Sequence, residues 1–167
     1  MIARETFATI NPRMGGIDTF KLRQRRGQIP LLDDRQRRGR GFFLVEAYLT
    51  TLVEEFRNCF GDLSLTFAAE LVQGAVEPLR EKWPEVVLDC RMREGDVLIG
   101  RIVRPDQPAE VFVGTSMEVS RANMTPCGEI VSVIAISASR AFDVFEIRCR
   151  RAGVDLPADF DLWAEVS

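Results

Sequence analysis

The spacing of apolar residues changes at Pro84, and this change constrains the fold more than any other feature of the sequence. Before Pro84 the apolar residues recur at three- and four-residue steps, which is typical of amphipathic helices. We therefore predict one helix over 42–60 and a second over 65–83, with Pro78 as a kink or a restart and Pro84 as the end. After Pro84 apolar and polar residues alternate, as in strands with one buried face.

This alternation predicts strands over 86–92, 97–104, 110–115, 129–137 and 142–150. A short helix over 116–124 is expected between the third and fourth strands, because Ser116 can cap it. The predicted fold class is therefore α+β: two N-terminal helices followed by a mainly antiparallel sheet of about five strands, with one short inserted helix.

The charges divide the chain near residue 40. The 167 residues hold 22 basic and 25 acidic side chains, for a net charge of −3. The first 40 residues hold ten basic and four acidic side chains, net +6, and the remainder is net −9. Within the basic part the sequence of Arg23–Gly27 recurs exactly at Arg35–Gly39. Such asymmetry between two parts of a chain points to a charged partner.

The composition of residues 1–41 argues against packed elements there. Helix- and strand-breaking residues interrupt it at Pro12, Gly15, Gly16, Gly27, Pro30, Gly39 and Gly41. We therefore predict two parts: an extended Arg-rich N-terminal arm over 1–41 and a single α+β domain over 42–167, a length that suits one core.

Two sets of arginines are candidate binding residues. The arm offers Arg23, Arg25, Arg26, Arg35, Arg37, Arg38 and Arg40. Extended Arg-rich segments bind nucleic-acid phosphates, dock on acidic proteins, or keep a terminus solvated. The second set is a strip on the predicted strands: Arg91, Arg93, Arg101, Arg148 and Arg150. These arginines could equally be solvated cross-strand partners of Asp89 and Glu146.

Catalytic chemistry has few candidates in this sequence. Histidine is absent, which excludes Ser-His-Asp triads, Cys-His pairs and His-containing zinc sites. The four cysteines lie 22 to 37 residues apart with no C-x-x-C pair, so reduced structural thiols are expected. The adjacent acids Glu54 and Glu55 are interpreted as a solvated helix face. No catalytic residue, metal site or cofactor is therefore expected.

The function predicted from these observations is a non-enzymatic structural or assembly subunit of a larger complex, such as a phage-like particle or a secretion-type assembly. Its partners would be protein subunits in a homo-oligomer or hetero-assembly, with the basic arm on an acidic neighbour, because the rest of the chain carries the opposite charge. The alternative is a nucleic-acid-associated protein that uses the arm as phosphate clamps. A small carboxylate-dependent enzyme is the third and weakest reading.

The expected compartment is the cytoplasm, or a particle assembled in it. No apolar run approaches the length that crosses a bilayer, and the N-terminal residues lack the apolar region of a secretory signal. No membrane partner is therefore expected.

Overall fold

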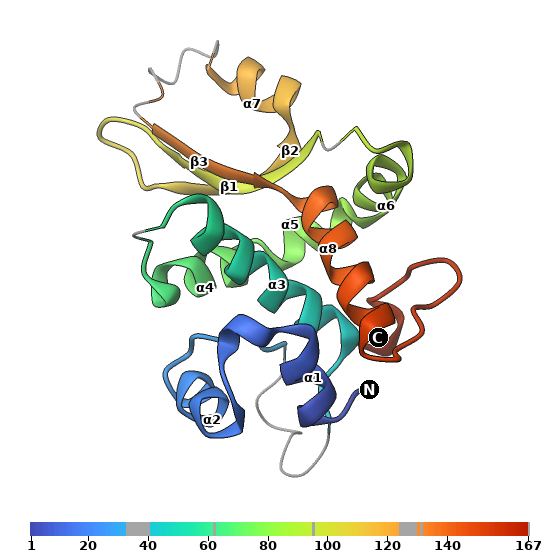
Figure 1. Ribbon diagram of the computed structural model, residues 1–167. Helices are drawn as coiled ribbons and strands as arrows, with labels where there is room; N and C mark the ends of the chain where they lie inside the picture. The colour runs from blue at the N-terminus through green and yellow to red at the C-terminus, as the bar shows by residue number, and fades with distance from the viewer. Residues whose placement is uncertain (33–40, 62, 95, 124–129, 131, 167) are drawn as a thin grey trace. The chain divides into compact units, whose positions relative to one another are not determined.

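The computed structural model describes residues 1–32, 41–61, 63–94, 96–123, 130 and 132–166. Over these residues the chain is α+β, with eight α-helices and one three-stranded antiparallel sheet (Figure 1). It divides into two compact units. Unit 1 contains Met1–Gln73 and Ala141–Ser167, and unit 2 contains Gly74–Arg140.

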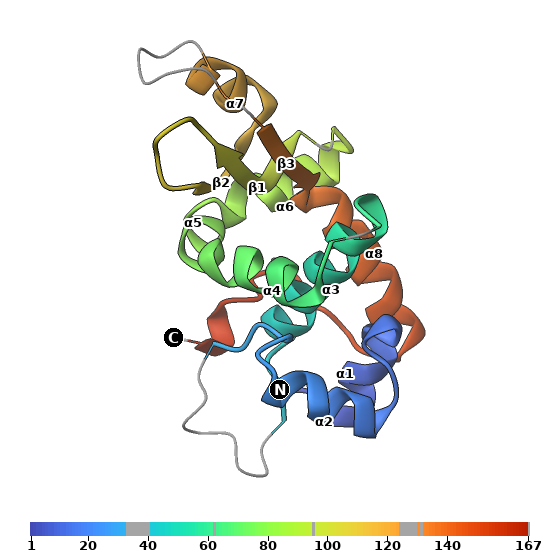
Figure 2. The same ribbon diagram turned by 90° about the vertical axis from the view of Figure 1, so that its left-hand side faces the viewer.

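Unit 1 is helical, and α3 (Leu44–Cys59) is its central helix, with α1 (Arg4–Ile10) and α2 (Ile17–Arg25) near one end of it (Figures 1 and 2). The other helical segments of this unit are η1 (Pro12–Met14), α4 (Leu65–Gly74) up to Gln73, α8 (Ala138–Arg151) from Ala141 onward, and η2 (Ala164–Val166). Helix α3 confirms the first predicted helix.

The N-terminal segment packs into unit 1 through aromatic rings. Phe7 on α1, Phe20 on α2 and Phe42 before α3 lie with ring centroids 4.5–5.3 Å apart, and all three are buried. Ile2 and Phe42 also exchange two backbone hydrogen bonds of 2.7 and 2.8 Å. The prediction of an extended arm over 1–41 is therefore wrong for its described part, because glycine and proline there separate short helices rather than prevent them.

Unit 2 contains the sheet, in the order β2-β1-β3: β2 (Glu110–Thr115), β1 (Val97–Val103) and β3 (Ser132–Ser137). In both views α5 (Val76–Glu81) lies on one side of the sheet and α7 (Ser116–Asn123) on the other (Figure 2). The remaining helix is α6 (Trp83–Met92). These three strands and α7 confirm the corresponding predictions, with bounds that differ by up to a few residues.

Close packing in the sheet requires glycine at position 100. Gly100 lies between Phe112 on β2 and Ala135 on β3. A Cβ atom at position 100 would lie 2.2 Å from the carbonyl oxygen of Ile134. The central strand therefore approaches its neighbour more closely than a side chain allows.

Two predicted strands are helices, so the expected five-stranded sheet is wrong. Residues 86–92 belong to α6, where the buried residues Trp83, Val86, Val87 and Cys90 recur with helical spacing. Pro84 lies in the first turn of α6 instead of ending the preceding helix, a position that suits proline because no intrahelical donor is needed there.

The prediction of a strand over 142–150 fails for the same reason. This segment lies within α8, and its apolar residues are buried at helical steps, at Ala138, Ala141, Phe142, Phe145 and Cys149. Ile147, which strand alternation would place beside Phe145, is 47% exposed. Apolar residues two positions apart, such as Phe145 and Ile147, therefore fit a strand pattern by coincidence. The buried residues of α8 taken together follow the helical period.

Candidate functional site

A buried ion pair lies at the centre of unit 1. The guanidinium of Arg148 on α8 donates to the carboxylate of Glu54 on α3 at 2.6 Å, and the Glu54 side chain is only 1% exposed. The backbone N–H of Arg13 donates to the other carboxylate oxygen at 3.0 Å. The expectation that Glu54 belongs to a solvated helix face is therefore wrong, whereas Glu55 is half-buried, 3.7 Å from Arg148.

Burial determines the protonation equilibrium of Glu54. Desolvation raises the pKa of Glu54 above its ordinary value of 4.5, although the charge and hydrogen bond of Arg148 act in the opposite direction. A hydrogen bond of 3.0 Å from Thr51 to Asn11 continues this polar contact between α3 and the N-terminal segment. Together these groups fix η1 against α3.

A cavity of about 340 Å³ opens beside this pair, lined by Arg13, Met14, Glu54, Arg57, Asn58 and Leu65. Arg23 on α2 adjoins it, because its guanidinium donates to the carbonyl oxygen of Arg13 at 2.8 Å. Burial and the positive charge of Arg57 lower the pKa of Arg23, and the charge of Glu54 offsets this only in part. The carboxylate of Glu54 therefore interacts electrostatically with Arg13, Arg23 and Arg148.

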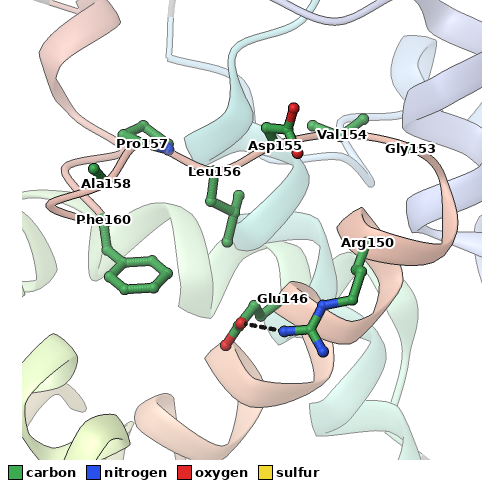
Figure 3. A pocket seen from close by; sticks show the side chains of 9 residues that line it. All are labelled: Glu146, Arg150, Gly153, Val154, Asp155, Leu156, Pro157, Ala158 and Phe160. Carbon is green, nitrogen blue, oxygen red and sulfur yellow. Dashed lines mark hydrogen bonds and ion pairs between the residues drawn. The ribbon is translucent and has the colours of Figure 1, made fainter.

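A second cavity of about 320 Å³ lies between α8 and the chain that follows it, also in unit 1 (Figure 3). Its lining includes the segment 153–158, Phe160 and two residues of α8, Glu146 and Arg150. Leu156 points toward these two α8 residues, whereas Asp155 points away from them (Figure 3). Arg150 donates to Glu146 at 2.8 Å, so the facing charges neutralise each other.

The predicted arm arginines have different environments. Arg23 is half-buried at the cavity beside Glu54, while Arg25 and Arg26 are exposed at the C-terminal end of α2. The predicted residues Arg35, Arg37, Arg38 and Arg40 lie outside the described residues. The flanking residues Leu32 and Phe43 both donate their backbone N–H to the carboxylate of Glu46, each at 3.0 Å.

The predicted arginine strip is not a feature of one sheet. Arg101 lies on β1, but Arg91 and Arg93 lie at the end of α6, and Arg148 and Arg150 lie on α8. Arg93 has a positive φ of 59° and ends α6 in the left-handed conformation. The placement of Arg91, Arg93, Arg148 and Arg150 on strands is therefore wrong, and Arg148 instead pairs with the buried carboxylate of Glu54.

Among the described residues no group of three or more acidic or cysteine side chains is arranged to hold a metal ion. Cys59, Cys90 and Cys149 are reduced cysteines that are not in disulfides. Burial raises the pKa of Cys149 to about 12, so that this thiol stays protonated near neutral pH. In the same part of the chain, no helix is long and apolar enough to span a bilayer.

Local sequence patterns contain little indication of the Glu54 site. Its only signal is that Thr51 and Glu54 continue the stripe of α3 that contains the buried Ala47. A polar residue on an otherwise buried stripe requires a buried partner. Comparison with known proteins adds no further residues: no protein-family model matches the chain, and no curated protein matches it.

Proposed function

We propose that this chain is a non-enzymatic subunit of a larger protein assembly, of the phage-like or secretion type, in which its basic N-terminal residues dock on an acidic surface of a neighbouring copy. The observation that carries the proposal is the way α2 presents Arg25 and Arg26. Phe20 anchors α2 among buried aromatic rings, and both arginines are exposed at the end of the same helix. The anchored helix therefore fixes the backbone from which both charged side chains extend.

The positions of Arg25 and Arg26 leave both guanidinium groups open to a partner. Neither makes an ion pair with another residue in the described part of the chain. Preordered charges lose less conformational entropy on binding than charges on a loose segment, so they suit a specific docking contact.

An acidic counterpart is present on every copy. Glu77 and Glu81 lie one turn apart on α5, and both are exposed. The net charge of −9 on residues 41–167 favours contact with a basic helix end over contact with a polyanion. A second copy of this chain is therefore the neighbour we propose.

The test is charge reversal in the full chain, because removing residues 1–40 would also remove the buried rings of Phe7 and Phe20. We expect wild-type protein to self-associate in sedimentation and to dissociate with rising salt. Arg25→Glu with Arg26→Glu should abolish association while the circular dichroism stays unchanged. Reversing Arg121 and Arg140, which are also exposed, is the matched control and should leave association intact.

A charge swap sharpens the result. The variant carrying Glu77→Arg and Glu81→Arg should not self-associate, but it should bind the variant with reversed Arg25 and Arg26. A wild-type protein that stays monomeric at low salt contradicts the proposal. So does retention of a short DNA duplex by wild type that is lost when Arg25 and Arg26 are reversed, since that result identifies a nucleic-acid contact instead.

A further inference from the structure

The cavity beside Glu54 has a surplus of positive charge. Of its lining residues, Glu54 is already paired with Arg148 and accepts a hydrogen bond from the backbone N–H of Arg13. Glu55 accepts a hydrogen bond of 3.0 Å from Asn58, which also lines the cavity, and lies 3.7 Å from Arg148. The two carboxylates are thus occupied by contacts within the protein.

Four guanidinium groups belong to the same cluster: Arg13 and Arg57 in the lining, Arg23 beside Arg13, and Arg148 on Glu54. Two carboxylates therefore leave a formal surplus of two positive charges. Arg23 and Arg57 repel each other, as the lowered pKa of Arg23 indicates. An anion in the cavity would relieve this repulsion.

The positions of Arg13 and Arg23 are set by the fold. The short helix η1 carries Arg13 and is held to α3 by the hydrogen bond from its N–H to Glu54. Arg23 donates at once to the carbonyl oxygen of Arg13 and, at 3.4 Å, to the sulfur of Met14. These contacts order part of the cluster before any ligand arrives, which lowers the entropy cost of binding.

We propose that this cavity binds the phosphate group of a small phosphomonoester. Two surplus charges match a phosphate dianion, and the planar guanidinium group suits bidentate contacts with its oxygens. The volume of about 340 Å³ exceeds what a phosphate alone occupies. The lining residues Met14 and Leu65 are apolar and can contact the organic substituent.

This site is separate from the proposed docking contact, because Arg25 and Arg26 do not line the cavity. The ligand is a small molecule rather than a protein surface. Failure of self-association would therefore leave the phosphate site standing, and absence of phosphate binding would leave the docking proposal standing.

The test is calorimetric titration of the full chain with phenyl phosphate and, separately, with inorganic phosphate at constant ionic strength. Saturable one-site binding of phenyl phosphate is expected, with weaker binding of inorganic phosphate because it lacks the apolar part. Arg57→Gln should weaken phenyl phosphate binding about tenfold or more, since a charge-assisted hydrogen bond is lost. Arg13→Gln should also weaken phenyl phosphate binding, and this variant tests a lining residue of the same cavity that lies on η1 instead of α3.

Arg4→Gln is the matched control, because it removes the same charge from an exposed position outside the lining and outside the proposed docking contact. It should change the affinity by less than about twofold if binding is local, since exposed charges are screened over about 10 Å. Equal weakening by Arg4→Gln and Arg57→Gln would overturn the proposal by showing diffuse attraction. Absence of saturable binding of both phosphates by wild type would overturn it directly.

Discussion

The guanidinium of Arg148 and the carboxylate of Glu54 lie 2.6 Å apart, although 94 residues separate them in the sequence. Because Glu54 is almost fully buried and Arg148 is 16% exposed, each depends on the other for compensation of its lost hydration. The pair joins α8 to α3 inside unit 1, and the N–H of Arg13 adds η1 to the same contact. Replacement of either side chain should therefore lower the stability of unit 1 as a whole.

The first prediction concerns Arg148→Met, which keeps the alkyl stem and removes the charge. We expect the free energy of unfolding to fall by about 3 kcal/mol, because the buried carboxylate of Glu54 loses its ion-pair partner. Urea unfolding followed by circular dichroism measures the change. The double variant with Glu54→Leu should recover most of the loss. A double variant as unstable as Arg148→Met would show that the other contacts of Arg148, with the carbonyl oxygen of Ile10 and with Glu55, were responsible.

The second prediction concerns pH. Burial raises the pKa of Glu54 above 4.5 in the folded protein, so the folded state holds this proton more tightly than the unfolded state. The contribution of Glu54 to stability is thus greatest below the unfolded-state pKa, and it decreases as the pH rises through the folded-state pKa. Relative to Glu54→Gln, wild-type protein should therefore lose stability over the pH range above 4.5, the ordinary pKa of this carboxyl group.

The measurement is a series of urea transitions on both proteins over that pH range. Only the difference between the two proteins is interpreted, because the other carboxyl groups titrate equally in both. A difference that grows in favour of wild type with rising pH would show that the attraction of Arg148 outweighs the desolvation of Glu54.

Sequence patterns were sufficient for elements whose periodicity was unambiguous. Helix α3 follows the helical period, and β1 and β2 are short runs of apolar, largely β-branched residues, so their local pattern agrees with the structure. In α6 and α8 the strand and helix patterns coincide over several residues. Val86, Leu88 and Cys90 fit strand alternation, but Leu88 is exposed and Val87 is buried, which only the helical period explains.

The site around Glu54 could not be predicted from the sequence, for a different reason. Its residues come from η1, α2, α3 and α8, and nothing local in the sequence records that these elements meet. Glu54 resembles any surface glutamate of a helix until the position of Arg148 is known. Charge counting identified the N-terminal residues as basic, but it could not distinguish the half-buried Arg23 from the exposed Arg25.

The third prediction concerns the end of α6. Arg93 has φ of 59° and ψ of 30°, a conformation that an L-residue adopts at a cost of roughly 1–2 kcal/mol and that glycine adopts freely. Arg93→Gly should therefore raise the free energy of unfolding by about 0.5–1 kcal/mol. Arg91→Gly is the matched control. It lies in the last turn of the same helix and should lower stability by about 1 kcal/mol.

Equal destabilisation by the two glycine variants would contradict the left-handed helix end at Arg93. The comparison also bears on the predicted arginine strip, to which both residues were assigned. If Arg93 serves chiefly to end α6, then its replacement should leave every binding property of the chain unchanged.

The last prediction concerns Asp89, a buried residue on α6. One of its carboxylate oxygens accepts the N–H of Val97 at 2.9 Å and the hydroxyl of Ser139 at 2.5 Å, so it links α6 to the start of β1 and to the first turn of α8 within unit 2. Asp89→Ala should lower the free energy of unfolding by about 3 kcal/mol, because two donors then lose their acceptor away from water. Ser139→Ala should cost about 1–2 kcal/mol, since it removes only one of these bonds. The control is Glu94→Ala, because Glu94 is an exposed acid beyond the same helix end. This variant should change the free energy of unfolding by less than about 0.5 kcal/mol. A loss as large as that of Asp89→Ala would show that net charge, rather than the hydrogen bonds of Asp89, stabilises unit 2.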